Sequence, residues 1–276
     1  MKPLDAGNRR NLFERAISAV VLLPLAIWLT WLGGWPFAAL IAVAAGVGAV
    51  ELLLMSGRLG AAEWYGVAIA AAIPLVAALH GGETLLPEWA PLVLAFATLG
   101  LLGLLLFFHQ EQAEVPARAG RVTLAWLYCG LLASTLVGLR VHGGTAWVVL
   151  AFAVTWSNDT FAYFTGMLFG KHRIYQRVSP KKTWEGFAGG AVGSVVGALV
   201  VRSTLLPELP VPLAVLLGTG AAVLGPMGDL TESLLKRAAG VKDSGKLIPG
   251  HGGLLDRIDA LLFVVPWVYL FVRWLK

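Results

Sequence analysis

Long apolar runs follow one another along almost the whole chain, with short polar stretches between them. A helix that crosses the hydrocarbon core of a bilayer needs roughly 20 mostly apolar residues. Nine runs approach or reach that length. The first lacks a clear small-residue cleavage site, so we expect it to be retained and not removed as a signal peptide. The predicted spans are Ala16–Leu32, Trp35–Leu54, Trp64–Leu79, Leu92–Phe108, Val122–Leu139, Ala146–Phe169, Phe187–Val201, Leu213–Leu224 and Leu254–Leu275.

The composition is that of a membrane protein. Apolar residues make up 58% of the 276 residues and charged residues 13%, whereas a soluble domain carries roughly 25% charged residues. We therefore predict an all-α integral membrane protein, a polytopic helical bundle of about nine transmembrane helices with catalytic loops at its cytoplasmic edge. Cys129 is the only cysteine, so no disulfide framework is expected.

The basic residues are distributed unevenly between the two sides of these spans. Of the 21 Lys and Arg residues, 17 fall on the side of the N-terminus and 4 on the other. Cytoplasmic loops carry the excess of Lys and Arg, so the N-terminus and the segments 170–186 and 225–259 are predicted to be cytoplasmic. This pattern explains the net charge of +5 without nucleic acid as a partner. We divide the chain into residues 1–145, an N-terminal region of about five spans, and residues 146–276, a C-terminal catalytic region with both cytoplasmic segments.

An acidic residue lies inside the sixth predicted span. Asp159 is 13 residues beyond Ala146, which is about 20 Å along a helix at 1.5 Å per residue. An ionised carboxylate at that depth is costly unless it faces a wet cavity or a cation. The alternative is that Asn158 and Asp159 form hydrogen bonds between helices.

A basic loop follows that span. Residues 171–186 contain five Lys and Arg residues, whose cationic groups can bind phosphate oxygens while hydroxyl groups add hydrogen bonds. The alternatives are that the loop contacts anionic lipid head groups or only fixes the orientation of the chain. The candidate phosphate-binding residues of this loop are Lys171, Ser179, Lys181, Lys182, Thr183 and Glu185.

Acidic, basic and glycine residues alternate between residues 225 and 259. The eighth apolar run is short, so its helix is expected to continue past Gly228 and to carry Asp229, Glu232, Lys236 and Arg237. Two acid pairs, Asp229 with Glu232 and Asp256 with Asp259, are each spaced three residues apart and so share a helical face. Carboxylate oxygens suit Mg²⁺, and the backbone amides of the stretch 251–253 at a helix start suit phosphate. The pattern indicates phosphoryl or nucleotidyl transfer.

These residues resemble the signature of the phosphatidate cytidylyltransferases, the CDP-diacylglycerol synthases of bacteria. The resemblance rests on Ser233-Leu-Leu-Lys236-Arg237, Lys242-Asp243 and Pro249-Gly-His251-Gly252-Gly253-Leu-Leu-Asp256-Arg257-Ile-Asp259. The stretch SPKKTWEG and the pairs Asn158-Asp159 and Gly170-Lys171 agree with it, so that it covers roughly residues 155–263.

The resemblance implies a reaction, in which phosphatidic acid attacks the α-phosphate of CTP and displaces pyrophosphate. It also implies Mg²⁺, a second monovalent or divalent cation, a homodimer, and a multi-pass protein in the bacterial inner membrane. The implied metal ligands are Asp229 and Asp256, with Asp159 and Asp259 as second choices. The implied catalytic residues are Asp229, Asp256, Lys236, Arg237, Asp243 and Asp259. The implied substrate-binding residues are those of the basic loop together with Lys242, His251, Gly252, Gly253 and Arg257.

Other readings of the same residues stay open at this point. A CTP-dependent lipid kinase or a cytidylyltransferase for another lipid would use the same nucleotide. A transporter would use Asp159 and Asp256 for ion coupling, although the inverted repeats typical of transporters are not found. Glu51, near the end of a span and beside the loop of Arg58, is expected to be a snorkelling or paired surface acid and not a catalyst. Gly189, Gly193 and Gly197 form a four-residue ladder that predicts close helix packing, either internal or across a dimer.

Overall fold

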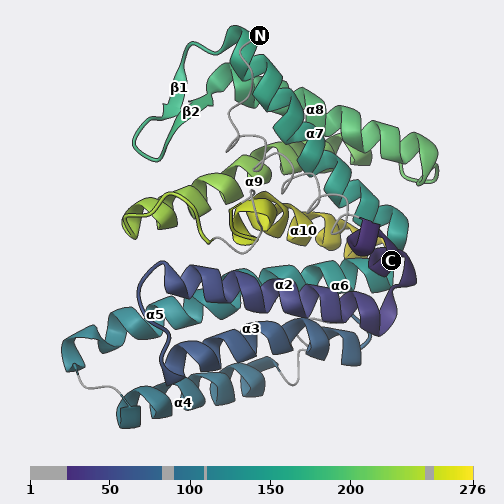
Figure 1. Ribbon diagram of the computed structural model, residues 1–276. Helices are drawn as coiled ribbons and strands as arrows, with labels where there is room; N and C mark the ends of the chain where they lie inside the picture. The colour runs from purple at the N-terminus through teal and green to yellow at the C-terminus, as the bar shows by residue number, and fades with distance from the viewer. Residues whose placement is uncertain (1–23, 83–89, 109–110, 246–251, 276) are drawn as a thin grey trace, which may run out of the picture.

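The computed structural model describes residues 24–82, 90–108, 111–245 and 252–275, and these residues are mostly helical (Figure 1). Residues 24–32 are helical and are followed by α2 to α10. A 3-10 turn, η1 (Gln112–Glu114), precedes α5, and a π-helical segment, η2 (Trp126–Leu131), joins α5 to α6. The helices are α2 (Gly34–Leu54), α3 (Ala61–Leu79), α4 (Ala90–Phe108), α5 (Val115–Ala125), α6 (Leu132–Gly143), α7 (Thr145–Phe169), α8 (Trp184–Thr204), α9 (Val211–Ala238) and α10 (Leu255–Leu275).

The helices have the lengths and surfaces of membrane-embedded elements. Within the described ranges, six helical segments are long and apolar enough to cross a membrane, namely α2, α3, the continuous segment from η1 to α6, α8, α9 and α10. Large apolar side chains cover the outside, and Phe107 and Leu106 are 79% and 75% exposed. Such a surface is unfavourable in water but suits contact with lipid. These features are those of an integral membrane protein.

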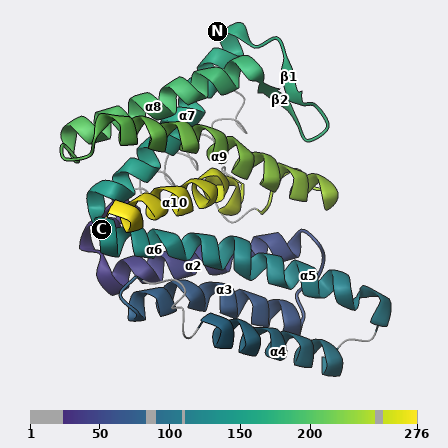
Figure 2. The same ribbon diagram turned by 180° about the vertical axis from the view of Figure 1, so that it is seen from behind.

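The chain runs back and forth, so that distant connections meet at one end of the bundle. The connections 55–60, 170–183 and 239–245 lie together at the left of Figure 1 and at the right of Figure 2. The turn at Gly144 and the connection 205–210 lie at the opposite end. The first three connections are those that the charge distribution places on a common side.

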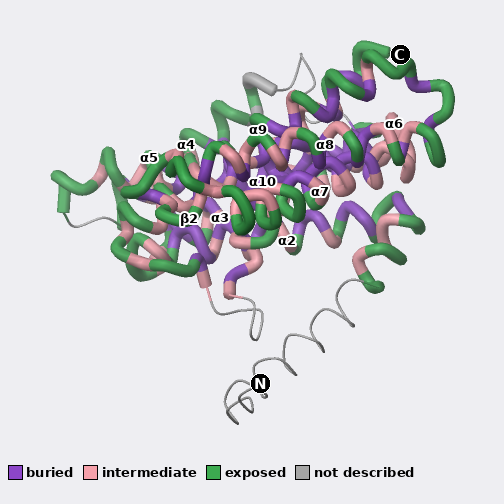
Figure 3. Tube along the Cα trace, turned by 90° about the horizontal axis from the view of Figure 1, so that it is seen from above, coloured by how far each residue is buried: buried purple, intermediate pink, exposed green. Residues whose placement is uncertain are grey.

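The helices are arranged in layers. α9 and α10 lie between the pair α7–α8 and the group formed by α2, α3 and α6, with α4 packed outside α3 (Figures 1 and 2). Seen from above, the buried positions gather along the middle of the bundle (Figure 3). Leu150, Leu217 and Leu255 are fully buried there. α10 is therefore enclosed by helices from both halves of the chain.

The glycine ladder of α8 packs against α7. A Cβ atom on Gly193 would lie 2.5 Å from the carbonyl oxygen of Ser157, and one on Gly197 would lie 2.3 Å from the Ser157 hydroxyl. On Gly189 it would lie 2.0 Å from the hydroxyl of Thr165. Small residues at such positions allow two helices to approach closely in a membrane. The ladder is therefore an internal packing surface.

We expect Gly193→Ala to destabilise the protein by about 1–3 kcal/mol, since the new methyl group would meet backbone that cannot move aside. Thermal unfolding of the purified protein in detergent measures the change. Val192→Leu is the matched control, because the neighbouring Val192 is 58% exposed on the outer face. Equal melting temperatures for the two variants would contradict the close packing of α7 and α8.

The helical fold class agrees with the prediction, and the basic loop adds one short hairpin of β1 (Arg173–Tyr175) and β2 (Ser179–Thr183), which pair antiparallel. The seventh span is longer than predicted, because α8 begins at Trp184 and has 21 residues. The continuation of α9 past Gly228 is confirmed, and it brings the charged residues of that segment onto a helix.

Candidate active site

The polar parts of α7, α9 and α10 enclose a cavity of about 290 Å³. Five carboxylates from the three helices line it, although only the two acid pairs of α9 and α10 share a simple sequence spacing. The fold therefore brings together acids that lie as far apart in the sequence as Asp159 and Asp259. Its lining is Thr155, Trp156, Asp159, Asp229, Glu232, Lys236, Asp256, Arg257, Asp259 and Ala260.

Close contact between α9 and α10 makes the two acid pairs face each other. Gly228 lies against the backbone of α10, where an added Cβ would be 2.5 Å from the carbonyl oxygen of Asp259. Asp229 and Glu232 follow on the same face of α9, as the spacing predicts. Asp256 lies in the first turn of α10, where the positive end of the helix dipole stabilises a negative charge. Asp259 is buried one turn further on.

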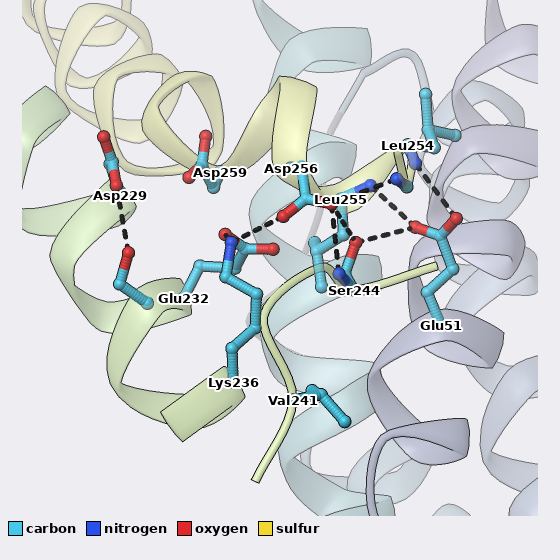
Figure 4. A network of polar contacts seen from close by, with 12 residues as sticks. Glu51, Asp229, Glu232, Lys236, Val241, Ser244, Leu254, Leu255, Asp256 and Asp259 are labelled. Atoms are coloured by element: carbon cyan, nitrogen blue, oxygen red, sulfur yellow. Dashed lines mark hydrogen bonds and ion pairs between the residues drawn. The ribbon is translucent and has the colours of Figure 1, made fainter. Parts of the chain in front are cut away.

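Lys236 lies between two of these acids. Its ammonium group contacts Glu232 Oε2 and lies 2.5 Å from Asp256 Oδ1 (Figure 4). The side chain is 11% exposed, so the three charges are largely withdrawn from water. The other oxygen of Glu232, Oε1, is buried and has no hydrogen-bond partner within the described residues. One lysine thus neutralises part of an excess of negative charge.

The carboxylate of Asp256 is held in one orientation. Its Oδ2 accepts hydrogen bonds from the Ser244 amide at 3.0 Å, the Ser244 hydroxyl at 2.8 Å and the Gly253 amide at 3.0 Å. Oδ1 points to Lys236 and the cavity (Figure 4). Ser244 is not among the site residues that the sequence predicts. The only signal for it is a small hydroxyl residue within the acid–glycine stretch.

The hairpin reaches the cavity through Lys182. Its Nζ lies 2.7 Å from Asp229 Oδ2, whose carboxylate also accepts a hydrogen bond from Ser233. The hydroxyl of Thr183 accepts a hydrogen bond from the Gly186 amide and so caps the start of α8. Glu185 accepts hydrogen bonds from the Lys171 and His172 amides, which fixes the base of the hairpin. Of these residues, Lys182 is the one that meets an acid of the cavity.

Asn158 and Asp159 have different surroundings. Asn158 is buried, and its side-chain amide lies 3.3 Å from the hydroxyl of Ser194 on α8, so it forms the hydrogen bond between helices. Asp159 lines the cavity. Asn158 and Asp159 therefore do not act together, because neighbouring residues on a helix point in different directions. Asn158 faces α8 and Asp159 faces the cavity.

Several predicted residues lie away from the cavity. Arg237 is exposed and donates a hydrogen bond to the Val241 carbonyl beyond the end of α9. Arg257 lines the cavity, whereas Gly252 and Gly253 precede α10. His251 lies outside the described residues. The remaining predicted residues are in connections at the same end of the bundle: Lys171, Ser179, Lys181, Lys242 and Asp243.

The donor set of the cavity fits a magnesium ion. Mg²⁺ prefers oxygen ligands and is commonly bound by one or two carboxylates together with substrate phosphates. The cavity offers carboxylates alone as anionic donors, and Glu232 Oε1 is a buried oxygen without a hydrogen-bond partner in the part of the chain that the structure describes. As the side chains stand, no three His, Cys, Asp or Glu residues in the described part of the chain are placed to hold a metal ion. Lysine ammonium groups lie against Asp229 and Asp256 instead.

The fold and the cavity define an integral membrane protein with an acidic site at one end of a helical bundle. The model of the cytidylyltransferase family matches residues 13–275. The chain belongs to this family, and it is an enzyme of the nucleotidyltransferase class.

Several relatives match over almost their whole length. Each is named phosphatidate cytidylyltransferase. The protein of Brucella abortus is 36% identical over 271 residues, which cover 95% of this chain and 93% of the relative. The protein of Synechocystis is 35% identical over 288 residues, with 94% and 96% covered. The protein of Thermotoga maritima is 32% identical over 271 residues, with 96% and 98% covered.

Proposed function

We propose that this protein transfers CMP from CTP to phosphatidic acid, with Mg²⁺ as cofactor, and produces CDP-diacylglycerol and pyrophosphate. The observation that carries the proposal is the cavity in which carboxylates from α7, α9 and α10 meet Lys182 and Lys236. The relatives named phosphatidate cytidylyltransferase support the choice of nucleotide and acceptor, since they align with nearly the whole chain.

The side chains of the cavity position the reactants and neutralise their charge. Lys182, Lys236 and Arg257 are the cationic groups proposed to bind phosphate oxygens, by the charge-assisted hydrogen bonds that such groups form. The acceptor is a phosphate monoester and is already mostly ionised at pH 7, so no strong general base is required. Alignment of the attacking and leaving oxygens together with charge neutralisation is sufficient for reactions of this type.

The acids of the cavity are proposed to hold the metal. Asp229 and Asp256 would be its ligands, with Asp159 or Asp259 beside them, and Glu232 supplies a further oxygen. A bound magnesium ion supplies charge neutralisation for the triphosphate and orients it. The excess of acids over lysines in the cavity supports a site for a second cation as well.

An apolar groove next to the site supports a lipid acceptor. It has a volume of about 800 Å³ and is lined mainly by small and aliphatic side chains of α2 and α3, together with Glu51, Ser244 and Gly245. Pockets for small ligands have volumes of roughly 300–1,000 Å³. Ser244 connects the groove to the acid cavity, because it lines the groove and donates a hydrogen bond to Asp256. An acyl chain in this groove would bring its phosphate close to Asp256.

The membrane arrangement is part of the proposal. We propose nine transmembrane spans in the bacterial inner membrane, with the N-terminus and the acid cavity on the cytoplasmic side, and a homodimer. The bundle end that carries the basic hairpin and Lys236 supports this orientation, since basic residues mark the cytoplasmic side.

Lys182→Ala is expected to reduce kcat/KM for CTP by roughly 10- to 100-fold, the effect of losing a hydrogen bond to a charged group. The measurement is a steady-state assay at varied CTP concentrations. Arg177→Ala is the matched control, because Arg177 is exposed between the two strands of the same hairpin. If both variants lower kcat/KM only slightly and to the same extent, the hairpin serves only to orient the chain in the membrane.

The test of the function is a pair of assays with purified protein, Mg²⁺ and phosphatidic acid, one with CTP labelled at the α-phosphate and one with CTP labelled at the γ-phosphate. The expected result is label in the lipid product from the α-phosphate only, with release of one pyrophosphate for each lipid formed. Transfer of label from the γ-phosphate, with none from the α-phosphate, would identify a lipid kinase and refute the proposal. No transfer from either position would refute it as well.

A further inference from the structure

Glu51, in the last turn of α2, is a buried carboxylate outside the acid cavity. The sequence places it near the end of an apolar run and predicts a snorkelling or paired surface acid. That prediction is wrong, because Glu51 is 4% exposed. Among the described residues it contacts the connection before α10 and the start of α10, about 200 positions further along the chain. A buried charge of this kind requires compensating hydrogen bonds.

Those hydrogen bonds come from the backbone that carries Asp256. Glu51 Oε1 accepts from the Leu254 amide at 3.0 Å, and Oε2 accepts from the Leu255 amide at 2.8 Å (Figure 4). The first amides of a helix have no partner within the helix, and a negative charge beside them is stabilised by the helix dipole. Glu51 therefore caps α10 from another helix.

Two glycines allow the carboxylate to come this close. A Cβ atom on Gly245 would lie 2.5 Å from Glu51 Oε1, and one on Gly253 would lie 2.8 Å from Oε2. The same Cβ on Gly253 would lie 1.9 Å from the Ser244 hydroxyl. Any larger residue at either position would therefore displace the carboxylate or the backbone around it.

Ser244 lies between Glu51 and Asp256. Its hydroxyl is 2.8 Å from Asp256 Oδ2 and 3.4 Å from Glu51 Oε2. A hydroxyl has one proton to donate, and the shorter distance identifies Asp256 as the acceptor. The Leu254 and Leu255 amides hold Glu51, and the Ser244 and Gly253 groups hold Asp256. Backbone amides of the consecutive residues 253–255 thus hold both carboxylates, and Ser244 adds two further hydrogen bonds to Asp256.

We propose that Glu51 is a positioning residue for the transfer reaction: it fixes the turn at the start of α10 and thereby the direction of the Asp256 carboxylate. Glu51 lines the apolar groove but not the acid cavity, so it is placed beside an acyl chain and not at the reacting phosphates, and we do not count it as a catalytic residue. The proposal rests on the proposed function for its kinetic consequence. Its structural consequence, an ordered turn before Asp256, can be measured without any substrate.

The test compares Glu51→Gln with Glu63→Gln. Glutamine keeps the shape of Glu51, but it carries no charge and has one acceptor oxygen in place of two. Glu63 is also a buried acid of the N-terminal half, but it accepts hydrogen bonds from Arg118 and Gly60, whereas Glu51 accepts them from the start of α10. Both changes remove a buried negative charge, and only the first removes the cap of α10.

For Glu51→Gln we expect kcat to fall roughly 10- to 100-fold, the usual range for residues that orient a metal ligand. The KM for CTP should change less than threefold, because Glu51 does not touch the nucleotide site. Backbone amides at residues 252–258 should exchange with deuterium faster. The rise in melting temperature that MgCl₂ produces without substrate should become smaller. Glu63→Gln should leave these four quantities unchanged when rates are expressed per folded molecule.

A double variant tests whether the effect passes through the turn. If Glu51 and Ser244 act on the same carboxylate, Glu51→Gln with Ser244→Ala should lose no more activity than the worse single variant. If the fold-loss of activity in the double variant equals the product of the two single losses, Glu51 and Ser244 act independently, and the proposal is overturned. Gly245→Ala provides a second route if Glu51→Gln does not fold, since its methyl group would crowd the carboxylate without removing the charge.

The outcomes separate this proposal from the proposed function. Equal losses of kcat in the Glu51 and Glu63 variants, with unchanged amide exchange before Asp256, would overturn the positioning role. If the unaltered protein transfers no CMP, the proposed function fails. Amide exchange and the effect of MgCl₂ on melting temperature then still decide whether Glu51 orders the turn.

Discussion

Replacing Asp256 by asparagine is expected to reduce CMP transfer by roughly 10²–10³-fold while leaving the protein folded. Losses of this size are typical when an active site loses one preorganised charged contact. Asparagine can keep its oxygen toward the Ser244 and Gly253 donors, so the turn before α10 persists. Its amide group then faces Lys236 with hydrogens instead of a charged oxygen, and the site loses one negative charge.

The measurement is incorporation of labelled CMP into lipid by the purified variant, with thermal unfolding in detergent as the check on folding. Glu208→Gln is the matched control, since Glu208 is an exposed acid in the connection at the opposite end of the bundle. Turnover of the Asp256 variant close to that of the control would remove Asp256 from the reaction.

The second large effect is expected for Lys236→Met, which keeps a long apolar stem and removes the ammonium group. Glu232 and Asp256, which are 1% and 13% exposed, would then face each other without a cation. Removing one partner of a buried ion pair costs about 3–5 kcal/mol, so the melting temperature should fall clearly. Activity should fall by at least roughly tenfold, because a charged contact to the substrate phosphate is lost as well.

Combining Lys236→Met with Glu232→Gln separates the two causes. The double variant has no uncompensated charge at Glu232, so we expect its melting temperature to recover while its activity stays low. Recovery of both quantities would show that Lys236 serves stability alone. Arg58→Met, a change at an exposed basic residue in the connection after α2, measures the background effect of such a substitution.

The arrangement of the acids was predictable where one helix carries the whole pattern. The spacing of Asp229 and Glu232 places them on one face in any helix, and the shortness of the eighth apolar run indicates that α9 continues past Gly228. The glycine ladder of α8 was predictable for the same reason, as a repeat of four marks one side of a helix. In each case the spacing of residues along a single helix determines which side of that helix they occupy.

Other features depend on contacts that no local pattern specifies. The strands β1 and β2 are short and rich in basic and polar residues, so nothing in their composition distinguishes them from an irregular loop. The burial of Glu51 follows from its contact with amides about 200 positions away. Asn158 and Asp159 are neighbours in the chain, and only the position of α8 decides which of them faces the cavity.

The cap of α10 by α2 sets an order of events during biosynthesis. A ribosome releases residue 51 into the membrane long before residues 244–255, so the nascent chain holds the Glu51 carboxylate without its amide partners for most of translation. The turn that orients Asp256 can become ordered only after the chain has been made through the start of α10. An earlier translation product would carry the basic hairpin and α9 and still be inactive.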